Sequence, residues 1–254
     1  MNRFADLVAA NLLDGVSQPP IDVHAVAARC GVRVVEYASL HEDGRFSWEG
    51  NTPVVGLRRD RSLARKRFTL AHELAHWALS SHVSDGPSYR RMTLDPSAEE
   101  RLCDAIAGAL LMPSPWVQRW ADDPLSLDRL REMATKAGVS LSAAAVRLAE
   151  TRGEVSMLLR WRTVGGLWIL AGMAGVPRHM GRPIAMTSQA QRAVDKLADE
   201  DTWLALKLGF GATAHQVKAH VSRGDTVSLM LVTKVYGLRP ERRMLHEYPA
   251  NAST

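Results

Sequence analysis

The chain has 254 residues, 46% hydrophobic and 23% charged, with a net charge of +5, a composition that excludes a disordered chain, a coiled coil and a collagen-like repeat. Its longest apolar run, residues 167–176, is too short to cross a bilayer, and the polar N-terminal stretch does not resemble a signal peptide. The only two cysteines, Cys30 and Cys103, exclude a disulfide framework, so a cytoplasmic protein without membrane contact is predicted.

The spacing of apolar residues predicts a mixed α+β fold. The expected elements of the first half are two short helices, three strands and two long helices, at residues 3–13, 24–30, 32–37, 45–48, 52–57, 62–80 and 97–112. Two shorter helices follow between residues 126 and 149, joined at Gly138. Beyond them, strands are expected around one helix, at residues 155–161, 167–173, 188–208 (the helix) and 226–236.

Two changes of pattern divide the chain into three predicted parts. Asp122-Asp123-Pro124 separates residues 1–122 from a helical segment at 123–152, and the change to strand periodicity near Gly153 opens a small α/β part at 153–254. Residues 1–152 carry 19 basic and 19 acidic side chains, whereas residues 153–254 carry 13 and 8. The excess positive charge of the last part suggests that it has partners of its own.

The sequence His72-Glu73-Leu74-Ala75-His76 predicts a metal site. On a helix, residues i and i+4 lie on one face about 5–6 Å apart, so two imidazoles can bind one ion. Glu73 points away from that pair and can act as a general base on a metal-bound water. Two surface histidines on an amphipathic helix are the alternative, and the uncharged residues around them make it the weaker one.

A third ligand is expected from the second long helix. Glu100 and Asp104 again stand four residues apart, so Glu100 would bind the metal and Asp104 would accept a hydrogen bond from a ligating histidine. Glu99 points about 100° away around the helix and is expected to be solvated. Cys103 is a possible fourth ligand, but a buried apolar role suits it better.

These motifs resemble the ImmA/IrrE family of zinc metallopeptidases. The resemblance rests on RFTLAHELAH at residues 67–76, Glu100-x-x-x-Asp104 beginning 24 residues later, ALLMP at 109–113 and the opening blocks IDVHAVA and GVRVV. It implies a zincin-like metallopeptidase domain at residues 1–122, Zn²⁺ held by His72, His76 and Glu100, and Glu73 as the general base. Alanine at position 75 and Asp104 depart from the glycine and asparagine of many members.

The resemblance also implies a biological role. Members of this kind cleave helix-turn-helix repressors in stress-response or mobile-element circuits, so a protein substrate is the expected partner. Some longer members add a GAF-like sensor domain, which residues 153–254 could represent in divergent form. The alternative function is a transcriptional regulator or binding module on a peptidase fold, with the basic C-terminal part binding nucleic acid or a small ligand. The intact Glu73 favours the enzyme, because a binding module needs no general base.

Three weaker signals leave alternatives open. His82, Tyr89 and Arg90 are each candidates for stabilising an oxyanion. The basic run at residues 58–67 is either a docking surface or, more simply, a solvated face with Arg67 capping local structure. The segment at 123–152 resembles a helix-turn-helix, but its second helix, LSAAAVRLAE, offers few donors for reading bases, so a packing role is favoured over DNA binding.

Overall fold

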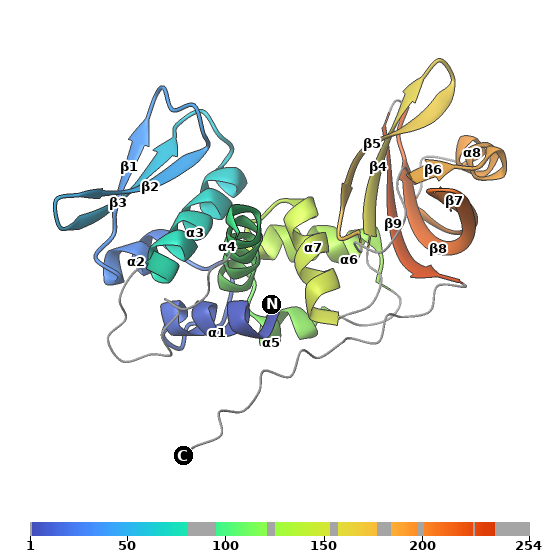
Figure 1. The fold of residues 1–254 in the computed structure, drawn as a ribbon. Coiled ribbons are helices and arrows are strands. Elements are labelled where there is room, and N and C mark those ends of the chain that lie inside the picture. Colours follow the sequence, from blue (N-terminus) through green and yellow to red (C-terminus); the bar gives the residue numbers. More distant parts are fainter. Residues whose placement is uncertain are drawn as a thin grey trace.

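The computed structural model describes residues 2–80, 95–120, 125–152, 157–176, 184–197, 201–225 and 227–236. The fold is mixed α+β, as the sequence predicts: a helical centre lies between a three-stranded sheet and a six-stranded sheet (Figure 1). Within the described residues, no helix combines the length and apolar character needed to cross a membrane.

The N-terminal half supplies the small sheet and the two long helices. Its elements are α1 (Asn2–Leu13), α2 (Val23–Arg29), β1 (Arg33–Tyr37), β2 (Gly44–Glu49), β3 (Thr52–Arg58), α3 (Leu63–Ser80), α4 (Pro96–Leu111) and α5 (Ser114–Gln118). Asp22 and Asp95 cap α2 and α4, each accepting a hydrogen bond from the backbone N–H three residues on, at 3.0 Å. These caps satisfy N–H groups that have no partner within the helix, which explains where both helices begin.

The small sheet places its edge strand beside α3. Its order is β1-β3-β2, with β1 parallel and β2 antiparallel to the central β3. The central strand is buried from Pro53 to Leu57, whereas β2 is an edge strand that packs against α3. Both β2 and the central strand β3 therefore lie against the histidine-bearing helix.

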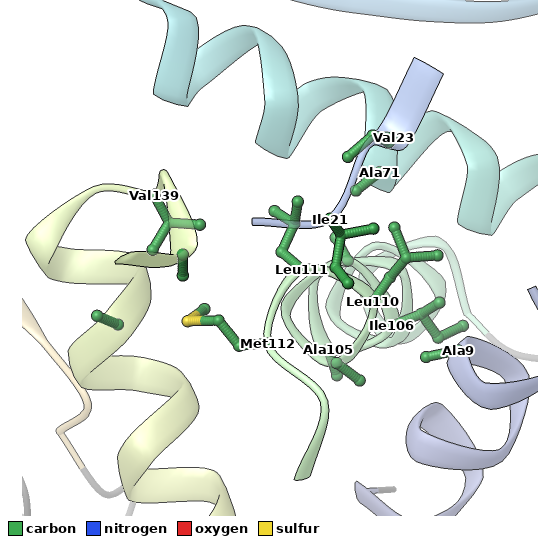
Figure 2. Close-up of a cluster of buried hydrophobic side chains, with 14 of the residues drawn as sticks. Ala9, Ile21, Val23, Ala71, Ala105, Ile106, Leu110, Leu111, Met112 and Val139 are labelled. Atoms are coloured by element: carbon green, nitrogen blue, oxygen red, sulfur yellow. The ribbon is translucent and has the colours of Figure 1, made fainter. Parts of the chain in front are cut away.

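Helix α4 forms the centre of the main hydrophobic core. Figure 2 shows Ala9 of α1, Ala71 of α3 and Val139 around Ile106, Leu110 and neighbouring α4 residues. Burial extends from Leu102 to Leu111, with Asp104 as the exception. A helix that is apolar around most of its circumference must be packed on several sides. Helix α4 is thus held firmly against α3, which fixes the relative positions of their polar side chains.

A compact helical hairpin follows. Helix α6 (Leu127–Ala137) begins at the cap Ser126 and ends at Gly138, whose φ of 63° is the left-handed conformation that favours glycine. Helix α7 (Leu141–Arg152) comes next. Arg67 of α3 donates hydrogen bonds to the carbonyls of Ala137 and Gly138, at 3.2 and 3.1 Å. Arg67 therefore caps the end of α6, in agreement with the simpler interpretation of the basic run.

The C-terminal part is a six-stranded antiparallel sheet with one helix. Its elements are β4 (Met157–Val164), β5 (Leu167–Ala174), β6 (Ile184–Met186), α8 (Ser188–Asp195), β7 (Thr202–Phe210), β8 (Thr213–Arg223) and β9 (Val227–Val235). The strand order is β5-β4-β9-β8-β7-β6. The predicted helix at residues 188–208 is wrong beyond Asp195, because Leu206, Leu208 and Phe210 are buried in alternation on β7, between β6 and β8.

Buried apolar residues form two clusters. The larger runs from α1 to α7 and takes in Leu158, Ala174 and Leu231 from the second sheet. The smaller lies between the other face of that sheet and α8. The predicted division at residues 122 and 152 stays a prediction, because 121–124 and 153–156 are outside the described residues.

Candidate metal centre

Helix α3 positions the two histidines and Glu73. Its buried residues include Thr69, Leu70, Ala71, Leu74, Ala75 and Ala78, which anchor the helix along most of its length. The rings of His72 and His76 lie 4.9 Å apart between centroids, as expected for residues four apart on one face. Both imidazoles are mostly buried, so their orientation is set by packing.

Packing of α4 on α3 brings Glu100 to the same point. The Nε2 atoms of His72 and His76 lie 3.2 Å apart. Glu100 Oε2 lies 3.2 Å from His72 Nε2, and Glu100 Oε1 lies 3.3 Å from His76 Nε2. With zinc–ligand distances of about 2.0–2.1 Å, neighbouring ligands of a tetrahedral ion are about 3.3–3.4 Å apart. Two imidazoles and one carboxylate at these separations fit zinc in both donor type and spacing.

Two further carboxylates hold the outer sides of the imidazoles. Asp104 Oδ1 lies 2.9 Å from His72 Nδ1. Glu99 Oε1 lies 3.3 Å from His76 Nδ1. A carboxylate at Nδ1 favours the tautomer with its proton there, leaving the Nε2 lone pair free for a metal. Burial disfavours a charged His72, but the hydrogen bond and charge of Asp104 outweigh it and raise the pKa of His72.

The contact of Glu99 corrects the expectation that this side chain is merely solvated. Its place on α4, taken alone, points it away from Glu100, but α3 crosses close enough for His76 to reach it. The contact depends on how two helices cross, which the residue spacing within either helix does not report. No sequence motif would have indicated it.

Glu73 lies beneath the edge strand and is only 8% exposed. Burial raises its pKa, against the opposing effects of His72, His76 and a backbone hydrogen bond from Phe46. A Cβ added to Gly44 of β2 would come 2.3 Å from Thr69 Cγ2 and 3.2 Å from Glu73 Oε1. Glycine at position 44 therefore allows β2 to close over Glu73, a requirement that the sequence analysis did not identify.

An open cleft of about 870 Å³ runs along these residues. One side carries His72, Glu73 and Glu100, and the cleft continues past Asp104 to α7 and β5. The residues that α7 and β5 contribute are Ser142, Ala143, Val146, Arg147, Glu150, Met173 and Ala174. The C-terminal sheet thus supplies part of the wall, which was not expected from the sequence.

The other candidates lie as follows. Cys103 is fully buried, and burial, followed by the charges of Glu99 and Glu100, raises the pKa of its thiol; among the described residues the donor cluster consists of His72, His76 and Glu100 alone. His82, Tyr89 and Arg90 lie outside the described residues.

The basic run at residues 58–67 is largely engaged within the fold. Arg61 and Arg65 both bind Asp43 at 2.6 Å, and Lys66 binds Glu36 at 2.8 Å. These ion pairs link the start of α3 to the small sheet. They favour a structural role over a docking surface for an acidic partner or nucleic acid.

Arg147 of the possible base-reading helix is also engaged. It is 1% exposed and donates to Met112 O at 2.9 Å, Asp6 Oδ1 at 2.6 Å and Ser114 Oγ at 2.9 Å. Helix α7 also packs against β4 and β5. These contacts favour packing between the two larger parts over DNA reading.

A mixed α+β fold with a His72, His76 and Glu100 cluster is consistent with a metallopeptidase-like fold. Residues 27–149 match the family Peptidase_M78, described as the IrrE N-terminal-like domain. The matched segment is slightly less than half of the chain, and the match agrees with the resemblance found in the motifs. None of the curated proteins compared matches the sequence.

Several solved structures resemble the chain, and one of them matches most of its length. It is a Mycobacterium tuberculosis transcriptional regulator, with a TM-score of 0.55 and 15% sequence identity. The match covers 91% of this chain and 76% of that one. At this identity the likeness shows a shared fold and nothing further.

Proposed function

We propose that this protein is a zinc-dependent endopeptidase that cleaves a protein substrate. The observation that carries the proposal is the convergence of His72, His76 and Glu100 at the spacing of a tetrahedral zinc ion, beside a buried carboxylate and an open cleft. The family match is its second support. We place the protein in the cytoplasm as part of the same proposal.

Each residue has a distinct role in this proposal. His72, His76 and Glu100 would hold the ion, while Asp104 and Glu99 orient the imidazoles. Bound zinc would act as a Lewis acid toward a peptide carbonyl and a water molecule. Glu73 takes a proton from the attacking water and delivers it to the leaving nitrogen. Its raised pKa suits this work, because a base whose pKa lies nearer to neutrality both accepts and returns a proton readily.

The substrate class is proposed from the family resemblance. A helix-turn-helix repressor in a stress-response or mobile-element circuit is the expected substrate. The open cleft is compatible with a segment of a polypeptide, because it extends from the metal ligands to α7 and β5 and is lined by small side chains such as Ala143 and Ala174 as well as by carboxylates. An adjacent repressor gene would supply the candidate to test.

The test compares the wild-type protein with Glu73→Gln. The variant should keep its zinc and its fold but cleave the neighbouring repressor about 10³-fold more slowly or worse, because an amide cannot act as the base. Glu36→Gln, which changes a carboxylate on the small sheet away from the cleft, is the matched control. Cleavage by Glu73→Gln at a near wild-type rate would rule out the proposed mechanism.

The second candidate is a regulator that uses the peptidase fold for binding. The positive charge of residues 153–254 favours it, whereas the buried Arg147 argues against α7 as its DNA-reading helix. If that charge binds nucleic acid, affinity must fall steeply with salt, because counterion release drives such binding. Salt-insensitive or negligible binding to duplex DNA would remove this candidate.

A further inference from the structure

Within the described part of the chain, one face of the second sheet is left partly uncovered. Strands β4, β5 and β9 carry Val164, Leu167, Ile169 and Val227 on this face, between 44% and 57% exposed. Arg162 lies among them, paired across the strands with Ile169 on one side and Val227 on the other. We call this surface, with Arg160, the sheet shoulder. Exposed apolar side chains grouped on one face mark interaction surfaces more often than isolated ones do.

The shoulder continues a surface on which a helix already packs. Side chains alternate along a strand, so Leu158 shares the face of Arg160 and Arg162. Leu158, with its neighbours Ala174 on β5 and Leu231 on β9, is buried in the core that contains α7. Helix α7 covers only this inner end of the face. The three strands are about 10 Å across, the width of one helix with its side chains.

The opposite face of the same strands is mostly covered, with Met173 as a partly exposed exception. Trp161 and Trp168 are buried there in the smaller core, and Trp168 Nε1 donates to Asp195 of α8 at 2.8 Å. The exposure of the shoulder is therefore a property of one face, and the strands are fixed from behind. A rigid backing keeps the uncovered side chains in place for a partner.

The positive charge of the sheet shoulder indicates which charge its partner should carry. Among the described residues, neither Arg160 nor Arg162 forms an ion pair, in contrast to Arg58, Arg61 and Arg65 around the start of α3. Arg160 lies over Gly172, with its Nε 3.4 Å from where a Cβ would stand. Glu73, Glu100, Asp104 and Glu150 line the cleft and would repel acidic residues there. Acidic residues of a partner would therefore be favoured at the shoulder.

The shoulder also leads directly to the cleft. Ala174 lines the cleft, and Gly172 beneath Arg160 is two residues away on the same strand. Ile169 and Ala174 are separated by about 15 Å along an extended strand. A segment bound on the shoulder would place the chain that follows it at the mouth of the cleft.

We propose that the sheet shoulder docks an acidic amphipathic helix of the protein substrate. The inference rests on the proposed peptidase function. The aliphatic side chains would cover the apolar side of the helix, and Arg160 and Arg162 would pair with its carboxylates. Nucleic acid fits less well, because the shoulder has no aromatic side chain for stacking and only two arginines for phosphates. A second copy bound face to face would bring the like-charged arginines together.

The test measures binding, so it does not depend on cleavage. The probe is a fluorescein-labelled amphipathic helical peptide with leucines on one side and glutamates on the other, added to zinc-loaded Glu73→Gln full-length protein. Anisotropy should report saturable binding with a Kd below about 1 mM. Arg160→Glu/Arg162→Glu should raise that Kd about tenfold or more. Leu167→Ser/Ile169→Ser should also weaken binding, and a peptide with lysines in place of the glutamates should not bind.

A matched variant controls for net charge. Arg192→Glu/Lys196→Glu makes the same change in charge at the exposed side of α8, behind the opposite face of the sheet. It should leave the Kd within about twofold of the parent protein. Loss of binding equal to that of the shoulder variant would mean that only total charge matters, and would overturn the proposal.

A different partner of the sheet shoulder would give different results in these measurements. No saturable binding of the acidic peptide, or unchanged binding after Arg160→Glu/Arg162→Glu, overturns the proposal while leaving the peptidase function intact. If the shoulder variants instead abolish self-association in light scattering, or binding to a DNA duplex, the surface belongs to a second copy or to nucleic acid. Failure of the peptidase function would show separately, as unchanged repressor cleavage by Glu73→Gln.

Discussion

Arg147→Met should destabilise the protein by about 3 kcal/mol. The side chain is 1% exposed and donates to three groups from two separate segments: the Asp6 carboxylate of α1, and the Met112 carbonyl and Ser114 hydroxyl at the junction of α4 and α5. Breaking a buried ion pair by removing one partner costs about 3–5 kcal/mol. The lower end applies here, because Asp6 is 34% exposed and water can replace part of the lost interaction.

Urea unfolding at neutral pH is the assay, supported by thermal unfolding, where a loss of this size lowers Tm by about 6–12 °C. Methionine keeps most of the volume of the side chain, so a cavity contributes little. Asp6→Asn and the double variant complete a thermodynamic cycle. The double variant should cost less than the sum of the single changes, since the Asp6 carboxylate is no longer left without its cation. Glu150, 3.8 Å from Arg147 Nη1, loses that partner in Arg147→Met and in the double variant alike. A loss below about 1 kcal/mol for Arg147→Met would refute the role of this network in holding α7.

Changes at four other positions test the surroundings of the site and the packing of the helical hairpin. His220 Nδ1 accepts a hydrogen bond from the Leu127 N–H at 3.2 Å, and burial lowers its pKa. The folded state thus resists protonation of His220, so the free energy of unfolding should fall as pH drops below about 6.5. In urea unfolding measured at a series of pH values, His220→Asn should make the free energy of unfolding less dependent on pH in this range. An unchanged dependence on pH would contradict this role of His220. Asp104→Ala and Glu99→Ala, which remove the accepting oxygens, should each weaken zinc binding about 10–100-fold in chelator competition, and unchanged affinity in both would mean that neither orients a histidine. Gly138→Ala should cost about 1 kcal/mol in thermal unfolding because its φ is 63°, with Gly138→Asn costing less.

Much of the candidate site could be predicted because it depends on the spacing within helices. Residues four apart on one helix lie on one face whatever the rest of the fold does, so His72 with His76, and Glu100 with Asp104, follow from the sequence. The long helices themselves were predictable from the apolar residues that their burial requires.

The remainder depends on contacts between distant segments. The contact of Glu99 with His76 follows from the crossing of α3 and α4, and the closure of β2 over Glu73 depends on Gly44. The cleft wall at Ala174 is formed by a strand far along the chain. Residues 202–208 were predicted as helix because their apolar pattern is short, and it was pairing with β6 and β8 that made them a strand.

The zinc content of the purified protein and its variants tests the central claim most directly. We predict about one zinc per chain for the wild-type protein and for Glu73→Gln, and loss of the metal for His76→Ala and Glu100→Ala. Cys103→Ser, at a buried position beside the cluster, should keep the metal. Full zinc in Glu100→Ala, together with loss of zinc in Glu99→Ala or Cys103→Ser, would contradict the assigned ligands.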